Sequence, residues 1–208
     1  MPTRKVSNRG GNIIGHHPSL KVGRMIAFES TVERDFIYLL DYDPDVKTFE
    51  EQPFIIEYEW AGKTHRYTPD FHVVRYGSEP MVECKPLKYV DDEDNQRKFH
   101  AASRWCLESG REFKVETEVA IRSGWRLKNV VKLTQFARHC VEPGYCRLIL
   151  GALGEDSVSI LELAQRVSAE PPNVMLFAIY HLAYHHILEM DVDYAPIGFG
   201  TLVKRGTC

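Results

Sequence analysis

The residues of this sequence with the clearest chemical potential are two carboxylates and a lysine. Asp70 follows Thr68 and Pro69, and Glu83 stands two residues before Lys85. Like charges a few ångströms apart repel, so paired carboxylates gain from a divalent cation between them. Carboxylate oxygens suit Mg²⁺ or Mn²⁺, and such an ion can activate water and support an in-line phosphoryl displacement. A lysine alongside could hold the attacking water or neutralise charge on the phosphate.

A β-hairpin would bring these three groups together. Residues 71–85 alternate apolar and polar side chains around a Gly-Ser-Glu-Pro turn at residues 77–80, which predicts two antiparallel strands. In a register that pairs Tyr76 with Met81, both carboxylates and the lysine lie on one face. The alternative is a solvated face with a Glu–Lys ion pair. The opposite face would pack on a core through Phe71, Val73, Val82 and Cys84.

A third carboxylate could come from a helix that precedes the hairpin. Residues 29–41 carry apolar side chains at helical spacing and predict an amphipathic helix. Ser30 suits the N-cap, and Glu33 three residues later would complete a capping box. The same Glu33 could instead face the hairpin as a metal ligand, with Glu29 as the alternative one turn earlier.

Two further strands lead into the hairpin. Residues 46–52 and 54–60 predict strands separated by Pro53, and residues 61–63 predict a hairpin turn. The expected result is a meander with the carboxylates at its centre. Gln52 is a polar residue in a strand pattern, so it either contacts phosphate or water in the site or bonds the sheet edge.

A helix and a strand follow the hairpin. Residues 91–109 predict a helix and residues 112–116 a strand. A strand-helix-strand unit favours a parallel crossover, so the fold class is α/β with a mixed sheet flanked by helices. Lys88, in the loop before the helix, is a candidate phosphate contact.

Composition limits the remaining possibilities. The chain has 208 residues, a net charge of −3, 44% hydrophobic and 26% charged residues, as in an ordinary soluble globular protein. A nucleic-acid surface must therefore be local, and no apolar run is long enough to span a membrane. Five cysteines without framework spacing indicate free thiols in a reducing cytoplasm.

Residues 1–25 predict a flexible basic arm. Arg4, Lys5 and Arg9 belong to a stretch without any acidic residue, and such a stretch can lie along phosphates. The alternative is a tail that is basic without a binding role.

The C-terminal part predicts a separate small domain, residues 141–208, after a larger domain at residues 26–140. Three helices followed by two strands are typical of a winged helix, a relative of the helix-turn-helix. The third helix is apolar and rich in histidine rather than basic, which favours a protein-binding surface or a helical core over base reading. The helices are expected at residues 145–153, 159–167 and 173–189, and the strands at residues 191–195 and 199–204.

These motifs together resemble a known family. A helix Glu followed by Pro-Asp and Glu-x-Lys is similar to the PD-(D/E)xK nucleases, which have the restriction-endonuclease-like fold. More narrowly, the sequence resembles TnsA, the endonuclease subunit of heteromeric transposases that include the CRISPR-associated type. Each short motif is common, but their order and intervals are specific, from about residue 12 to residue 119. The segments that carry the resemblance are residues 29–36, 39–41, 51–53, 67–71 and 82–86.

The resemblance implies a role in cut-and-paste DNA transposition in the bacterial cytoplasm. The TnsA-like subunit cleaves the non-transferred strand at the 5′ ends of the element. An integrase-type transposase, TnsB, processes the 3′ ends, and an AAA+ ATPase, TnsC, contacts the C-terminal domain. Glu33, Asp70 and Glu83 would then be catalytic metal ligands, with the Cys84 carbonyl as a further ligand of Mg²⁺ or Mn²⁺, as two ions. Lys85 would be the catalytic lysine.

Two other functions remain open from the sequence. A stand-alone restriction or repair nuclease of the same fold would cut DNA without a partner. A non-catalytic adaptor would join transposase and ATPase and leave the carboxylates idle, although it would not need Asp70, Glu83 and Lys85 together.

Overall fold

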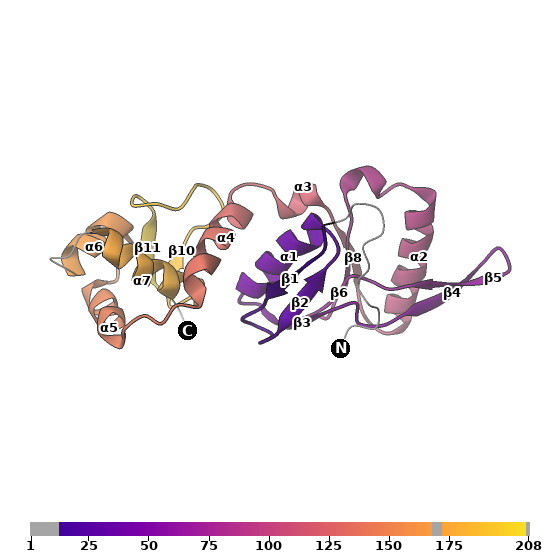
Figure 1. Cartoon of the computed structure of the whole chain (residues 1–208), viewed down its shortest axis with the longest axis horizontal. Helices are drawn as coiled ribbons and strands as arrows, with labels where there is room; N and C mark the ends of the chain where they lie inside the picture. The colour runs from indigo at the N-terminus through magenta and orange to yellow at the C-terminus, as the bar shows by residue number, and fades with distance from the viewer. Residues whose placement is uncertain (1–12, 168–171, 207–208) are drawn as a thin grey trace. The chain divides into compact units, whose positions relative to one another are not determined.

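The computed structural model of the protein describes residues 13–167 and 172–206 (Figure 1). The candidate DNA contacts Arg4, Lys5 and Arg9 lie outside the described residues. The chain divides into two compact units, Met1–Arg122 and Ser123–Cys208, and each is described by itself.

The first unit contains a mixed four-stranded sheet with strand order β3-β6-β7-β8. The pairs β3–β6 and β6–β7 are antiparallel and β7–β8 is parallel, as the strand-helix-strand pattern predicts. The mixed sheet and the helices around it fit the expected restriction-endonuclease-like α/β fold. Its elements are β1 (Gly15–Pro18), β2 (Met25–Phe28), α1 (Thr31–Tyr42), β3 (Val46–Glu51), β4 (Ile56–Trp60), β5 (Lys63–Tyr67), β6 (Phe71–Arg75), β7 (Met81–Cys84), the 3₁₀ turn η1 (Leu87–Tyr89), α2 (Glu93–Glu108), β8 (Phe113–Glu116) and α3 (Glu118–Ile121).

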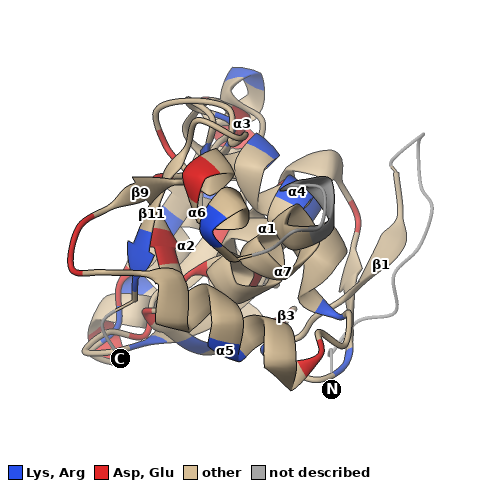
Figure 2. Ribbon diagram, turned by 90° about the vertical axis from the view of Figure 1, so that its left-hand side faces the viewer, with Lys and Arg blue, Asp and Glu red and all other residues tan. Residues whose placement is uncertain are grey.

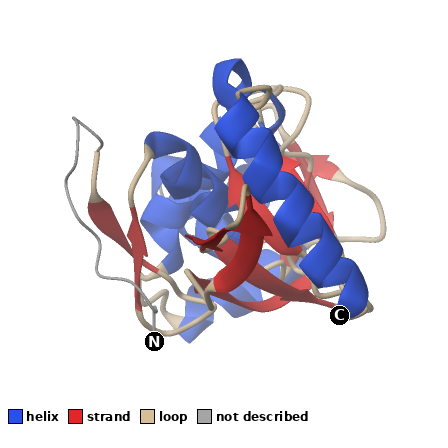
Figure 3. Cartoon of the chain, turned by 90° about the vertical axis from the view of Figure 1, so that its right-hand side faces the viewer, coloured by secondary structure: helices blue, strands red, loops and turns tan. Residues whose placement is uncertain are grey.

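Apolar side chains join the helices to this sheet. The ring of Phe36 in α1 lies 5.7 Å from that of Phe71 in β6, and Phe71 is completely buried. On α2, Phe99 packs 5.9 Å from Phe113 of β8. Figures 1 and 3 show the sheet between α1 and α2, with α2 as the long helix in front in Figure 3. Burial of each large apolar side chain contributes roughly 1.5–3 kcal/mol, so the two helices hold the sheet in a fixed position.

The predicted meander is not formed, because β3 pairs with β6 rather than with β4. The chain leaves the sheet at Gln52, whose φ is 45°, and continues through Pro53, which cannot donate to a strand ladder. Strands β4 and β5 then form a two-stranded hairpin of their own. The sheet is therefore interrupted in sequence between Glu51 and Phe71 but continuous in space.

The second half of the predicted flexible arm is folded in the structure. Strands β1 and β2 pair antiparallel, so residues 15–25 are part of a folded hairpin. Its turn is fixed to α1 by Asp41, which is buried and accepts hydrogen bonds from the Ser19 hydroxyl and from the backbone N–H groups of Leu20 and Lys21. Lys21 therefore belongs to the packed structure.

The division between the units lies after Arg122, whereas the sequence predicts it after residue 140. The Arg122 guanidinium is 2.8 Å from Asp35 of α1, which ties it to the first unit. Beyond it, the Trp125 N–H donates to the Asp193 carbonyl, and the Asn129 amide donates to backbone carbonyls near the C-terminus. Helix α4 thus packs with the second unit.

The second unit combines four helices with a three-stranded sheet of order β10-β11-β9. Residues 142–144, next to the boundary predicted from the sequence, form the start of α5, with Pro143 in its first turn. The predicted strand at residues 191–195 is a turn instead, because the Asp191 carboxylate accepts the N–H groups of Asp193 and Tyr194. The elements are α4 (Arg126–Ala137), α5 (Pro143–Ala152), β9 (Val158–Ser159), α6 (Ile160–Val167), α7 (Pro172–Tyr184), β10 (Leu188–Met190) and β11 (Leu202–Arg205).

Two histidines, His181 in α7 and His185 directly after its end, contact the C-terminal end of the neighbouring helix α4. A ring nitrogen of His181 lies 3.2 Å from the Phe136 carbonyl, and one of His185 lies 2.9 Å from the Ala137 carbonyl. Both carbonyls belong to the last turn of α4, where the helix itself supplies no i+4 N–H donor. His181 and His185 therefore help to join α7 to α4 within the second unit.

None of the helices in residues 13–167 and 172–206 has the length and apolar character needed to cross a membrane.

The Asp41 contacts give a stability prediction. Replacement Asp41→Ala leaves several buried donors without an acceptor and is expected to cost about 3 kcal/mol of unfolding free energy in urea denaturation. Burial alone would raise the pKa of Asp41, but His17, Ser19 and the two backbone N–H groups lower it. The stabilisation is therefore present above the ordinary carboxyl pKa and disappears below about pH 4.

The control for this measurement is Asp45→Ala, because Asp45 is exposed. Its unfolding free energy is expected to stay within about 0.5 kcal/mol of the unchanged chain. Equal stabilities of the Asp41 and Asp45 variants would show that the first hairpin is not fixed through Asp41.

Candidate active site

The hairpin β6–β7 places Asp70 opposite Glu83, in a register that differs from the predicted one. Met81 pairs with His72 rather than with Tyr76, four residues later. An even shift leaves every side chain on its predicted face, so the grouping of the carboxylates survives the error. The backbone N–H of Cys84 donates to the Asp70 carboxylate at 2.8 Å, which fixes the orientation of Asp70.

Glu83 lies on the central strand β7 and is 4% exposed. The Lys85 ammonium is 2.7 Å from one of its carboxylate oxygens, Oε1. The Tyr67 hydroxyl donates to the other, Oε2, at 2.6 Å. Both carboxylate oxygens of Glu83 are thus in contact with a partner, Oε1 with the Lys85 ammonium and Oε2 with the Tyr67 hydroxyl.

The sequence did not single out Tyr67 as a site residue. A tyrosine at the end of a strand pattern is typical of a β-sheet core, and its position three residues before Asp70 carries no signal of its own. The contact with Glu83 exists because β5 ends beside β7, which follows from the three-dimensional course of the chain.

Glu33 takes part in the N-terminal cap of α1. Its backbone N–H donates to the hydroxyl of the N-cap Ser30 at 3.1 Å, as predicted. Its carboxylate accepts from the Glu29 N–H at 2.8 Å, one residue before the N-cap, whereas the predicted capping box would use the Ser30 N–H. Burial raises the pKa of Glu33, and Glu29 and Glu83 raise it further. Glu33 is therefore within electrostatic reach of Glu83 while it caps α1.

Gln52 lies between the helix N-terminus and the hairpin. Its backbone N–H donates to the Asp70 carbonyl at 2.8 Å, and its side-chain amide is 3.4 Å from the Glu29 carboxylate. It borders the carboxylates, and these contacts fit both of the roles that the sequence allows. Lys88 differs, because its ammonium lies 4.5 Å from the ring centre of Tyr89 in the exposed turn η1.

Three carboxylates, Asp70, Glu83 and Glu33, lie close enough for their charges to alter pKa values in this cluster. Burial raises the pKa of Asp70 well above its usual range, and Glu83 and Glu33 raise it further against the opposing effect of Lys85. Burial alone would lower the pKa of Lys85, but Glu83, Asp70 and Glu33 raise it above its ordinary value. Lys85 is therefore an ammonium at neutral pH. It carries a positive charge and can donate hydrogen bonds.

Residues 43–118 match the family model described as TnsA-like endonuclease N terminal. This segment of the first unit is therefore similar to TnsA-like endonuclease domains. The matched segment contains Asp70, Glu83 and Lys85 and begins just after α1, so Glu33 and the second unit lie outside it. No curated protein matches the chain.

The chemistry of these three acids fits a hard divalent cation. Asp70, Glu83 and Glu33 offer oxygen donors only, and a cation would relieve the repulsion that raises the pKa of Asp70. Within the described ranges, no three His, Cys, Asp or Glu side chains form a group ready to hold a metal ion. In the structure the Glu83 carboxylate is directed to Tyr67 and Lys85.

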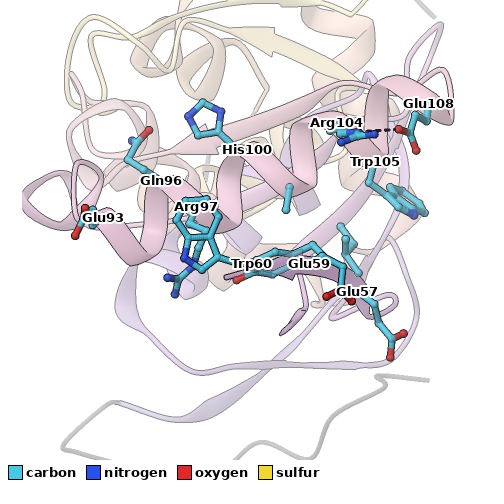
Figure 4. Close-up of a pocket in the computed structure, with 13 residues that line it drawn as sticks. Glu57, Glu59, Trp60, Glu93, Gln96, Arg97, His100, Arg104, Trp105 and Glu108 are labelled. Carbon is cyan, nitrogen blue, oxygen red and sulfur yellow. Dashed lines mark hydrogen bonds and ion pairs between the residues drawn. The ribbon is translucent and has the colours of Figure 1, made fainter. Parts of the chain in front are cut away.

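A groove in the first unit is separate from these carboxylates. It has a volume of about 790 Å³ and lies between the β4–β5 hairpin and α2. Figure 4 shows Trp60 and Arg97 on one side of it and Trp105 with the Arg104–Glu108 ion pair on the other. None of the site residues predicted from the sequence lines this groove.

The crowding of the acids predicts a gain of stability when one is neutralised. A carboxyl whose pKa rises on folding destabilises the fold progressively as pH increases above its unfolded value near 4. Asp70→Asn keeps an acceptor for the Cys84 N–H. In urea denaturation at pH 8 with EDTA, its unfolding free energy is expected to exceed that of the unchanged chain by roughly 1 kcal/mol. The difference should shrink as the pH is lowered toward 4.

Glu59→Gln is the matched control, because it neutralises an exposed acid of the same unit. It is expected to change the unfolding free energy by less than about 0.5 kcal/mol. An Asp70→Asn protein less stable than the unchanged chain at pH 8 would contradict the crowding of the carboxylates.

Proposed function

We propose that this protein is the DNA endonuclease subunit of a heteromeric transposase and cleaves the non-transferred strand at the 5′ ends of the element. The observation that carries the proposal is the grouping of Asp70, Glu83 and Lys85 within a segment that matches a TnsA-like endonuclease domain. An adaptor without catalysis would have no use for closely grouped carboxylates in which Glu83 and Glu33 raise the pKa of Asp70.

The proposed reaction is hydrolysis of a DNA phosphodiester. Asp70, Glu83, the Cys84 carbonyl and Glu33 would hold Mg²⁺ or Mn²⁺, as one or two ions. When bound, the cation would stabilise negative charge on the phosphate and lower the pKa of water. Lys85 would direct its ammonium to the attacking water or to the scissile phosphate, because it stays charged beside Glu83.

For the second unit we propose a winged-helix-like module that binds a protein partner, the ATPase TnsC. The order α5, β9, α6, α7, β10, β11 supports this type of module. Helix α7 carries no Lys, Arg, Asp or Glu, and its ribbon is tan in Figure 2. A helix without basic side chains is poorly suited to bind phosphates. Exposed Leu161, Phe199 and Leu202 offer apolar surface for a protein instead.

A cleavage assay on DNA that carries a transposon end tests the proposal. With Mg²⁺ and the partner transposase TnsB, the protein is expected to cut the non-transferred strand. Asp70→Ala is expected to cut at a rate about 100-fold lower, because the variant lacks the Asp70 carboxylate that we propose as a metal ligand. The exposed-site variant Glu59→Ala should cut normally.

The arms of this assay separate the possible functions. Undiminished cutting by Asp70→Ala would contradict the site assignment. Cutting by the protein alone would support a stand-alone nuclease instead. Transposition that needs the chain but tolerates Asp70→Ala would support an adaptor.

The role of Lys85 gives a separate prediction. Lys85→Ala is expected to lower the cleavage rate by roughly 100-fold while Mn²⁺ still binds, because the ammonium supports the reaction and is not a ligand. Isothermal titration with Mn²⁺ measures the affinity, and Lys63→Ala, an exposed lysine of the β4–β5 turn, serves as control. Loss of Mn²⁺ binding in the Lys85 variant would contradict the proposed division of roles.

A further inference from the structure

The Tyr67 hydroxyl is the feature of the site that neither the motif nor the family match explains. It donates to Glu83 Oε2 at 2.6 Å, and both residues are buried, at 7% and 4% exposure. Lys85 is 2.7 Å from the other oxygen of the same carboxylate. A carboxylate held at both oxygens cannot rotate freely about its terminal bond.

The direction of this hydrogen bond follows from the chemistry of the two groups. The Tyr67 hydroxyl carries the proton and donates it to Glu83 Oε2. The Glu83 carboxylate has only acceptor oxygens when ionised. Tyr67 is therefore the donor and Glu83 the acceptor.

The position of the phenol is set outside the strand that carries Glu83. Tyr67 ends β5, pairs with Ile56 of β4, and shares a buried cluster with Ile56 and Ala102 of α2. Phe54 and Trp105 pack against this cluster, with their rings 4.5 Å apart. The ring of Tyr67 is thus fixed by the β4–β5 hairpin and α2, and its hydroxyl reaches across to β7.

We infer that Tyr67 is a positioning residue, which holds the Glu83 carboxylate in the orientation that a divalent cation and the DNA phosphate require. The inference rests on the proposed nuclease function and names a residue that deepens it. A carboxylate that accepts one hydrogen bond per oxygen still has lone pairs for a cation. Partners of this kind orient metal ligands, and their loss typically costs 10–100-fold in affinity or activity.

A purely structural role for Tyr67 makes a different prediction. The ring supplies the packing with Ile56 and Ala102, and Phe retains that ring. If the hydroxyl only satisfied a buried acceptor, Tyr67→Phe would alter stability without altering Mn²⁺ affinity or rate. If it positions Glu83, affinity or rate must fall in a protein that is still folded.

The test compares Tyr67→Phe with Tyr58→Phe. Tyr58 lies on the neighbouring strand β4, where its ring stacks on that of His65 of β5, with 5.4 Å between the ring centres. Mn²⁺ titration calorimetry measures affinity, cleavage assays with the partner transposase measure rate, and circular dichroism monitors folding. Tyr67→Phe is expected to lose about 10–100-fold in Mn²⁺ affinity or in rate, and Tyr58→Phe neither.

Each other outcome overturns the assignment in a recognisable way. Unchanged affinity and rate in Tyr67→Phe, with a wild-type protein that binds Mn²⁺ and cuts, would remove the positioning role alone. An unfolded Tyr67→Phe protein would show that the hydroxyl maintains the fold rather than the site. A wild-type protein that neither binds Mn²⁺ nor cuts DNA would overturn the proposed function and this inference with it.

Discussion

The first unit is organised around mutual repulsion between three carboxylates, of which Glu83 is buried and Asp70 and Glu33 are half-buried. Asp70 directly precedes β6 and lies beside strand β7, which carries Glu83, and Glu33 adds a third negative charge from α1. In a low-dielectric environment such charges persist only where donors face them. The Cys84 N–H, the Lys85 ammonium and the Tyr67 hydroxyl are those donors, and each is held by a different part of the fold.

The elements around the site are arranged to keep these donors in place. The sheet fixes Cys84 and Lys85, because β7 is paired on both sides, to β6 and to β8. Helix α2 fixes Tyr67 indirectly through the hairpin against which it packs. The N-terminus of α1 carries Glu33, whose carboxylate is fixed by the Glu29 N–H. Stability and chemistry therefore draw on the same contacts, so neutralising an acid favours the fold and removes the reactive charge.

Much of this could be predicted from the sequence, because the signals were local. Alternation of side chains predicted the strands and the face that Asp70, Glu83 and Lys85 share, and Ser30 with Glu33 predicted the helix start. Pairings between distant segments were not local and were partly wrong. β3 pairs with a strand twenty residues further along rather than with the next one, and the turn after Arg75 is longer than expected. No pattern in the sequence indicated the bond from Tyr67 to Glu83.

The left-handed backbone of Gln52 has a consequence for how this fold can vary. The chain leaves the sheet there and returns at Phe71, so the β4–β5 hairpin is an excursion between two strands that are already paired. Residues at its tip can be added or deleted without shifting that pairing. Its base cannot change so freely, because Tyr67 must reach Glu83. Related chains are expected to differ in length at the tip while the last residue before the Thr-Pro-Asp turn keeps a hydroxyl.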